Sequence, residues 1–301
     1  MARRAGAQQR RTARRPRVPR YGGAVAERSD FNVRFWGVRG SIAAPGPATV
    51  KYGGNTSCVE MRCGAHLLIF DAGSGIRALG NDLETRGATD ADMFLSHTHY
   101  DHLLGLPFFC PAFDAGNHFH VWAGHLQPER TIESVLRAFM TDPLFPVPLD
   151  IFHARLTFHD FRAGEVLVPR PGITVRTASL NHPNRATGFR VEFAGKSACY
   201  VTDTEHVPGA PDAAVLGLID GADLVIYDAT YTDQEFARYK GWGHSTWEEG
   251  VRLAKAARVK RLVLFHHDPS HDDIALDAIG RAAAAALPGT IVAREGAILA
   301  P

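Results

Sequence analysis

Four side chains that bind metal ions lie within six consecutive positions of this chain. Residues 97–102 read HTHYDH and follow directly after an apolar, strand-like run, ADMFL. Side chains two apart on an extended segment point the same way, so His97 and His99 can close on one ion. Asp101 and His102 enter the following turn, where they can reach a second ion. The spacing predicts a centre of two metal ions, which can clamp both oxygens of a displacement reaction.

Histidine pairs also occur on solvated loops and in cores where both ring nitrogens are hydrogen-bonded. A lone HxH fits that interpretation as well as it fits a pair of ligands. The longer HxHxDH does not, because four metal-competent side chains would crowd one turn with nothing to neutralise them. The motif therefore favours metal binding.

The composition sets the class of protein. The chain has 301 residues, of which 45% are hydrophobic and 22% charged, a balance typical of one globular α/β domain. No apolar run approaches the length that crosses a membrane, so we expect no membrane partner. The cysteines form no CxxC pair, which predicts buried, reduced thiols and a cytoplasmic location. They are Cys58, Cys63, Cys110 and Cys199.

The first residues differ from the rest of the chain. Residues 1–20 hold eight arginines and no acidic residue, so this segment carries a charge of +8. The whole chain has a net charge of +1, and the remaining residues therefore carry −7. No apolar stretch follows the Arg-Arg pairs, which argues against an export signal. We expect residues 1–28 to be a disordered basic arm that contacts nucleic acid weakly, or an over-long gene start without function.

Beyond residue 28 the pattern changes to alternating strands and helices. Period-two alternation predicts strands, and start and stop signals predict helices. The predicted strands are 31–36, 58–62, 66–70, 91–95, 118–122, 155–158, 173–179, 189–193, 197–202, 224–227 and 262–265; the predicted helices are 129–140, 246–257 and 272–286. Two such halves predict an α/β fold of four layers, an αββα sandwich over residues 29–301, with the motif loops at one edge.

Five further motifs follow HTHYDH in a fixed order. They are Asn181-His182-Pro183, Val201-Thr202-Asp203-Thr204, Tyr227-Asp228-Ala229-Thr230, Gly243-His244-Ser245-Thr246 and Leu264-Phe265-His266-His267-Asp268. With HxHxDH, this series resembles the metallo-β-lactamase-fold hydrolases, and the resemblance covers most of residues 31–301. It implies the αββα fold and a hydrolytic metal centre.

The resemblance also implies a ligand set. His97, His99 and His182 would hold the first ion, Asp101, His102 and His266 the second, and Asp203 would bridge them; Asp101 counts among the catalytic residues as well. Of the pair at 266 and 267, the family places the ligand at the first position past the strand. Two cations lower the pKa of a bound water, so a bridging hydroxide is expected to attack.

Two side chains are expected beside the ligands. In the family, the aspartate matching Asp71 fixes a ligand histidine through a hydrogen bond, and we expect this role rather than direct ligation. His267 is expected beside the mouth of the site or in the same kind of supporting role. Two divalent ions are implied, zinc first, with manganese and iron as alternatives.

The later motifs narrow the resemblance to a phosphodiesterase branch. This branch includes ribonuclease Z, cyclic-nucleotide phosphodiesterases and the cyclic-phosphate phosphodiesterase of phosphonate breakdown. In ribonuclease Z a glutamate usually stands at the position of Asp228 and pairs with the histidine matching His244. Asp228 is one methylene shorter, and His244 is expected to bind phosphate or to act as the general acid.

The substrate is expected to be small. Ribonuclease Z carries a long tRNA-binding arm between the motifs matching His182 and Asp203, whereas here only 20 residues separate them. We therefore expect a small phosphodiester, such as a cyclic nucleotide or related cyclic phosphate. The alternatives are a thioester or lactam hydrolase on the same metals, a tRNA-processing ribonuclease without the arm, and a non-catalytic binding protein. A homodimer is compatible with the sequence.

Overall fold

The computed structural model describes residues 31–301, which form two seven-stranded sheets. In spatial order the first sheet is β14 (Ile298–Leu299), β1 (Phe31–Gly37), β2 (Cys58–Cys63), β3 (His66–Phe70), β4 (Asp90–Leu95), β5 (His118–Ala123) and β6 (Arg155–Asp160). The second is β13 (Ile291–Val292), β12 (Leu262–Phe265), β11 (Leu224–Asp228), β10 (Lys196–Val201), β9 (Ala186–Phe193), β8 (Ile173–Leu180) and β7 (Val166–Arg170).

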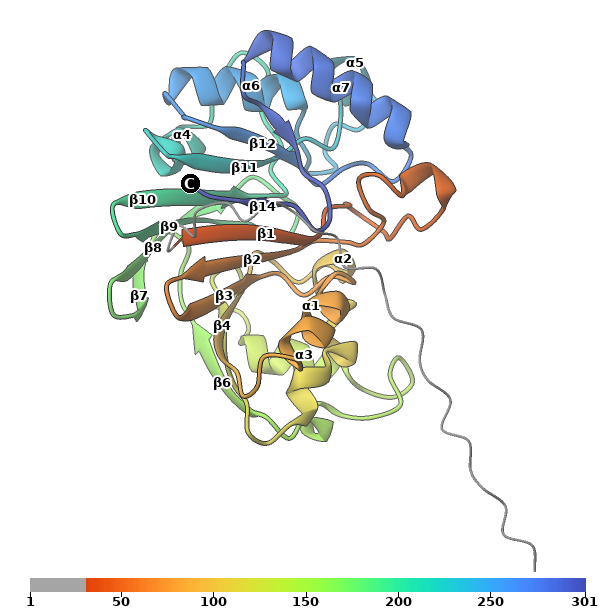
Figure 1. The fold of residues 1–301 in the computed structure, drawn as a ribbon, viewed down its shortest axis with the longest axis vertical. Coiled ribbons are helices and arrows are strands. Elements are labelled where there is room, and N and C mark those ends of the chain that lie inside the picture. Colours follow the sequence, from red (N-terminus) through yellow and green to blue (C-terminus); the bar gives the residue numbers. More distant parts are fainter. Residues whose placement is uncertain (1–30) are drawn as a thin grey trace, which may run out of the picture.

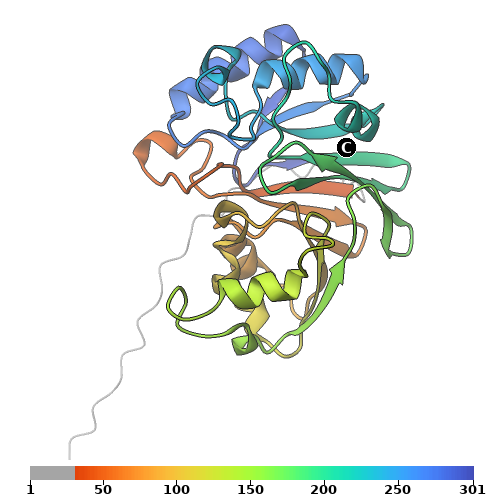
Figure 2. The same cartoon turned by 180° about the vertical axis from the view of Figure 1, so that it is seen from behind.

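Helices cover the outer face of each sheet (Figures 1 and 2). α1 (Ile76–Leu83) and α3 (Ile132–Phe139) lie below the first sheet; α4 (Ala213–Ile219), α6 (Trp247–Ala256) and α7 (Asp273–Ala286) lie above the second; α2 (Tyr100–Leu103) and α5 (Asp233–Phe236) are single turns in loops. The predicted αββα sandwich is confirmed. The predicted arm, residues 1–28, lies outside the described residues.

Three apolar clusters separate these four layers. The central cluster lies between the sheets, where Phe70 and Phe94 of the first sheet meet Phe189 of the second at ring-centroid distances of 5.4 and 5.6 Å. The outer clusters lie under the helices of each side. β4 is buried on both faces after Asp90, which is why it appears in the sequence as an unbroken apolar run.

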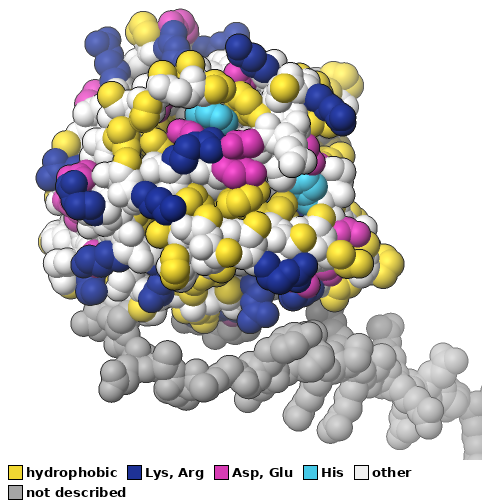
Figure 3. Space-filling model, turned by 90° about the horizontal axis from the view of Figure 1, so that it is seen from above, with side chains coloured by type: hydrophobic (Ala, Val, Ile, Leu, Met, Phe, Trp, Pro, Cys, Tyr) yellow, Lys and Arg dark blue, Asp and Glu magenta, His cyan; other side chains and the backbone are white. Residues whose placement is uncertain are grey.

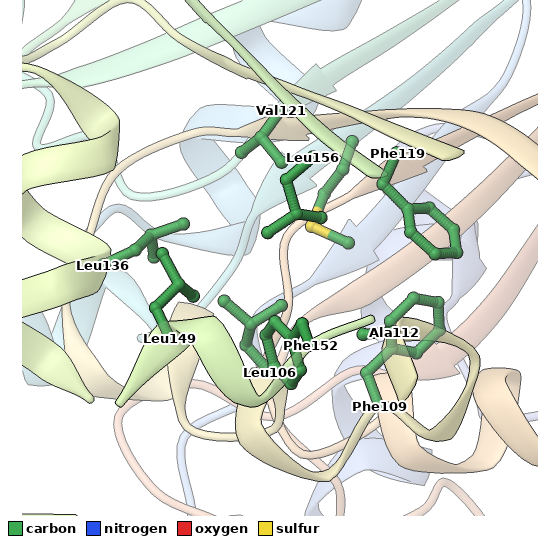
Figure 4. Close-up of a pocket in the computed structure, with 10 residues that line it drawn as sticks. Leu106, Phe109, Ala112, Phe119, Val121, Leu136, Leu149, Phe152 and Leu156 are labelled. Carbon is green, nitrogen blue, oxygen red and sulfur yellow. The ribbon is translucent and has the colours of Figure 1, made fainter. Parts of the chain in front are cut away.

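The cluster beneath the first sheet contains a small gap (Figure 4). Its volume is about 10 Å³, and only apolar side chains line it, among them Phe109, Leu136 and Phe152. A dry gap of this size has no polar partner for a water or a ligand, so it is a packing defect and not a binding site.

Strand direction gathers the motif loops at one edge. β3, β4, β5 and β6 run parallel to one another, and so do β10, β11 and β12. The carboxyl ends of parallel strands meet at the same edge of a sheet. The segments that leave these ends therefore lie together.

Most predicted elements are present, with differences at their ends. Thr131 caps α3, which therefore begins later than the predicted residue 129. Thr246 caps α6, so the start of this helix agrees with the predicted one. Strands β7, β13 and β14 and helices α1, α2, α4 and α5 were not predicted. Of the four free cysteines, three are buried and Cys110 is partly exposed. No helix among the described residues is long and apolar enough to cross a membrane.

Candidate metal centre

Three histidines converge at the end of β4. His97 and His99 follow β4 directly, and His182 follows β8. The Nε2 atom of His97 lies 3.0 Å from Nδ1 of His99, which lies 3.1 Å from Nε2 of His182. These three nitrogens face one another, as in the ligand set of a zinc-type ion.

Four more side chains form a second group beside the first. Asp101 and His102 come from α2, Asp203 from the loop after β10, and His266 from the end of β12. The Nε2 atom of His102 lies 3.2 Å from Asp101 Oδ2 and 3.3 Å from Asp203 Oδ2. The Nε2 atom of His266 lies 3.3 Å from the same two oxygens. All four side chains are buried.

Asp203 lies between the two groups. Its Oδ1 lies 3.7 Å from Nε2 of His97 and 3.8 Å from Nε2 of His182, in the first group. Its Oδ2 faces the imidazoles of the second group. One carboxylate oxygen therefore points to each candidate ion position, which is the geometry a bridging ligand needs.

Hydrogen bonds fix the tautomers of His182 and His102. Nδ1 of His182 donates to the carbonyl oxygen of Gly243 at 2.8 Å, because a carbonyl can only accept. Nδ1 of His102 lies 2.7 Å from the Asp71 carboxylate, to which it donates. Nε2 of the neutral His182 ring is then an acceptor. At His102 the carboxylates of Asp101, Asp203 and Asp71 outweigh burial and raise the pKa of the ring, yet its fully buried Nε2 has no hydrogen-bond partner. A cation is the partner that such an atom lacks.

The same reasoning applies to His97 and His266. The Ser96 hydroxyl donates to Asp71 at 2.8 Å, so it accepts from Nδ1 of His97 at 3.1 Å. The Thr230 hydroxyl donates to the Asp228 carboxylate at 2.6 Å, so it can accept from Nδ1 of His266 at 3.0 Å. Both Nε2 atoms are left as acceptors that point into the centre. The residues present fit a bound divalent cation.

Burial and mutual charge set the protonation of the centre. Burial lowers the pKa of His97 and of His182, so these imidazoles are neutral at pH 7. Burial opposes ionisation of Asp203 and Asp101, but the surrounding imidazoles outweigh it and hold both pKa values far below the usual range. Neutral His97 and His182 and the ionised Asp101 and Asp203 are thus in the protonation states in which such side chains bind metal.

Three residues of the centre adopt a left-handed backbone. The φ angles are 61° at Asp71, 54° at Asp203 and 60° at His266, each at or just past the end of a strand. Non-glycine residues seldom adopt this conformation, which costs about 1 kcal/mol or more at each position. Strained residues of this kind cluster at functional sites.

A second pair of ionisable groups lies beside Asp203. His244 Nδ1 lies 3.1 Å from Asp228 Oδ2 and 3.7 Å from Asp203 Oδ1. Burial disfavours the charged imidazole, but the carboxylates outweigh it and raise the pKa of His244 to about 9. Asp228 also accepts from the Thr230 hydroxyl, so one carboxylate supports both His244 and His266.

The chain matches a known protein family over most of the described residues. The pattern of the "Beta-lactamase superfamily domain" matches residues 66–267, about two thirds of the chain. The chain belongs to the β-lactamase superfamily. The predicted family is confirmed, and with it the prediction of a metal-dependent hydrolase.

Relatives within the β-lactamase superfamily are named ribonucleases. Ribonuclease Z of Parabacteroides distasonis is 29% identical over 173 residues, which cover 58% of this chain and only 50% of that protein. Ribonuclease Z of Myxococcus xanthus is 24% identical over 266 residues, covering 72% of this chain and 83% of that protein.

Solved structures of the superfamily share the fold. Zinc-bound PqqB from Methylobacterium extorquens superposes with a TM-score of 0.68 at 16% identity, covering 90% of this chain and 100% of that one. A diphosphatase from the PhnP family gives a TM-score of 0.67 at 18% identity, covering 90% and 98%.

The seven predicted ligands of this β-lactamase-superfamily chain all lie in the two groups. Asp71 lies against His102, where a supporting role was expected. His267 does not: its Nε2 donates to the carbonyl oxygen of Ala293 at 2.8 Å, and its side chain is buried away from any mouth. The expectation of a supporting role at the centre is therefore corrected for His267, because the left-handed turn at His266 sends the two neighbouring side chains to different surroundings.

Sequence reasoning missed several supporting residues. Ser96, Thr230 and Gly243 lie next to predicted site residues in the chain, so adjacency was an available signal. No sequence signal pointed to Tyr200. Its hydroxyl donates to the Asp71 carboxylate at 2.8 Å, although the two residues are 129 positions apart in the sequence.

Proposed function

We propose that the chain is a phosphodiesterase that uses two divalent cations, zinc first, to hydrolyse small phosphodiesters such as cyclic nucleotides. The observation that carries this proposal is Asp203, whose two oxygens face separate ligand groups beside the His244–Asp228 pair. When bound, two cations would supply an activated water and would neutralise charge on the phosphate.

The chain's own residues would divide the work. His97, His99 and His182 would hold one ion, Asp101, His102 and His266 the other, and Asp203 would touch both. Asp71, Thr230 and the Gly243 carbonyl orient the imidazoles, so that the ligand nitrogens do not have to reorganise when a cation binds.

His244 would act on the leaving group. Its raised pKa keeps the imidazole protonated at neutral pH, and the Asp228 carboxylate holds its Nδ1 in place. The remaining N–H can then donate to a phosphate oxygen, and pass its proton to the leaving oxygen as the ester bond breaks. This pairing favours phosphorus chemistry over attack on a lactam or thioester carbonyl.

The surroundings of the site favour a small substrate. Between His182 and Asp203 the chain forms only β9 and β10, so the tRNA-binding arm expected of ribonuclease Z has no counterpart there. Figure 3 shows the face above the second sheet, where basic side chains are scattered among acidic and apolar ones and form no stripe.

An aromatic series leads outward from His244 and favours a nucleotide. The Tyr231 ring meets His244 edge-on at 6.0 Å and stacks on Tyr239 at 4.4 Å, and Tyr239 contacts Trp242 at 5.4 Å. Trp242 is 62% exposed and precedes Gly243, whose carbonyl holds His182. An exposed indole so near the centre offers a stacking surface for a base.

The test is turnover by purified protein loaded with zinc or manganese. Bis-p-nitrophenyl phosphate, cyclic AMP, cyclic GMP, a precursor tRNA and a nitrophenyl thioester are compared. We expect hydrolysis of the small diesters. Asp203→Asn should lose several orders of magnitude, while Asp220→Asn, an exposed carboxylate of the α4–β11 loop, should behave as wild type.

Two results would contradict the proposal. Cleavage of precursor tRNA alone would favour the ribonuclease alternative that the named relatives suggest. Hydrolysis of the thioester alone would reject phosphodiester chemistry altogether.

A further inference from the structure

A second cluster of histidines lies at the opposite end of the first sheet. His118 and His120 are on β5, and Asp90 begins the neighbouring parallel strand β4, paired with His118. The metal centre follows the carboxyl ends of these strands, whereas this cluster lies at their amino ends. With a rise of ~3.3 Å per strand residue, the cluster is about 20 Å from the metal centre.

The cluster has the composition of a metal site. One nitrogen of each imidazole and one oxygen of Asp90 lie within 4.8 Å of one another. The two rings are 4.0 Å apart between centroids, and Nε2 of His120 lies 3.6 Å from Asp90 Oδ1. Side chains two apart on a strand point the same way, which is why β5 presents both imidazoles together.

The next strand, β6, fixes the orientation of both rings. Nε2 of His118 is hydrogen-bonded to the Thr157 hydroxyl at 2.9 Å, and Nδ1 of His120 to Nε2 of His159 at 3.1 Å. His159 in turn stacks on Trp122 with ring centroids 4.0 Å apart. With one nitrogen engaged on each ring, Nδ1 of His118 and Nε2 of His120 are left for a ligand, as at the metal centre.

The charges around the cluster are compatible with a cation. Burial, together with His118, lowers the pKa of His120, which keeps it in the neutral, ligating form. Arg170 is the competitor, because it pairs with Asp90 at 2.5 Å. Arg170 also pairs with the buried Asp92 at 2.5 Å, so the guanidinium would keep one carboxylate partner if Asp90 bound a metal ion.

We propose that Asp90, His118 and His120 bind a third divalent transition-metal ion, of the zinc type, separate from the metal centre. Two imidazoles and a carboxylate supply three ligands, and the partly exposed position leaves a fourth place for water. An ion there would join β4 to β5 and, through His159, to β6. Its competition with Arg170 predicts weaker binding than at the buried centre.

The experiment compares the metal content of variants. Full-length protein is equilibrated with excess zinc, freed of unbound ion, and assayed for zinc per chain. The variant His118→Asn/His120→Asn should hold one equivalent less than wild type, with turnover of bis-p-nitrophenyl phosphate unchanged. His153→Asn, which removes an exposed histidine outside the cluster, should lose none. The difference between counts is what matters, so the test does not depend on how many ions the centre holds.

A single variant that changes the size of the side chain little tests the site in case the double variant does not fold. Asp90→Asn keeps the size of the side chain and should weaken the affinity for the last zinc at least tenfold, measured by competition with a chelator. Equal zinc content in wild type and the double variant would overturn the proposal. So would an unchanged affinity in Asp90→Asn, or a double variant that remains folded and loses the zinc of the metal centre.

Discussion

His266 and His267 are neighbours in the chain but have opposite surroundings. Nε2 of His266 faces Asp101 and Asp203, whereas His267 donates to the Ala293 carbonyl. His266→Ala should therefore remove about one metal equivalent and most of the turnover. His267→Ala should keep the metals and lose stability by about 1–3 kcal/mol, because it leaves a buried carbonyl unpaired. Metal analysis and thermal unfolding of both variants check this, and loss of metal from His267→Ala alone would show the assignment to be reversed.

The His244–Asp228 pair predicts how turnover depends on pH. The pKa of His244 is raised to about 9, so the proton-donating form is present below that value and is lost as pH rises through it. Asp228→Asn removes the carboxylate that contributes most to this rise, so the alkaline limb of the kcat profile should move to lower pH. His244→Gln should keep its metals and lose roughly a hundredfold or more in kcat.

The control for that comparison is the metal content of each variant. The profiles are measured with saturating metal and bis-p-nitrophenyl phosphate, so that bound cations affect wild type and variant alike. An alkaline limb that stays in place in Asp228→Asn would exclude His244 as the titrating donor.

Trp242 predicts a preference for substrates that carry a base. Stacking contributes about 1–3 kcal/mol per base, so Trp242→Ala should raise KM for cyclic AMP roughly fivefold or more. Its kcat should change little, because the indole lies outside the reacting groups. Trp242→Phe should restore much of the affinity. A ribose cyclic phosphate that lacks the base should show no difference among these proteins, and an equal loss on that substrate would reject stacking as the cause.

At the scale of elements, the loop after β1 supports the metal centre. The backbone N–H of Ser41 donates to Asp101 Oδ2 at 2.7 Å. The buried Arg39 donates to the carbonyls of Asp268 and His271, and so holds the segment that follows His266. Gly40 lies so close that an added Cβ would be 2.3 Å from the His266 ring. The loop therefore packs directly against a ligand of the second group.

Gly40→Ala should displace His266 and weaken the second metal position. We expect at least a tenfold loss of turnover together with about 1–3 kcal/mol of stability, the usual cost of overpacking. The matched control is Gly217→Ala in α4, where an added Cβ meets nothing within 4 Å. Metal titration of both variants checks the result, and a Gly40→Ala protein with normal metal affinity would contradict it.

At the scale of the whole molecule, residues 31–301 contain both sheets, all seven predicted ligands and the His244–Asp228 pair. A protein that begins at residue 29 should therefore keep its fold and its turnover of small diesters. Any affinity for polyanions should fall steeply and lose its salt dependence, because the truncation removes nine arginines and one glutamate, a net charge of +8. Unfolding temperature, turnover and binding to heparin at two salt concentrations measure this. A truncated protein that unfolds would show that the first 28 residues belong to the domain.

The sequence alone was sufficient for the local parts of the molecule. HxHxDH could be identified because its ligands are adjacent, and the strands because period-two alternation is a property of the extended backbone itself. Motif order then indicated the αββα fold. The start of α3 was predicted at residue 129 and not at Ile132, because the apolar pattern does not mark the Thr131 cap. The starts of α6 and α7 were predicted within one residue.

Tertiary structure decided what depends on strand order. Asp203 faces both ligand groups because β8 and β10 are each antiparallel to β9 between them, and so run the same way and end at one edge. Tyr200 reaches Asp71 only because the two sheets stack. The pairing of β5 with β6 brings His159 within hydrogen-bond distance of His120. The left-handed backbone at His266 precedes His267, whose side chain does not lie at the metal centre. Such contacts join residues far apart in sequence and are set by how the sheets pack, so no local pattern of residues encodes them.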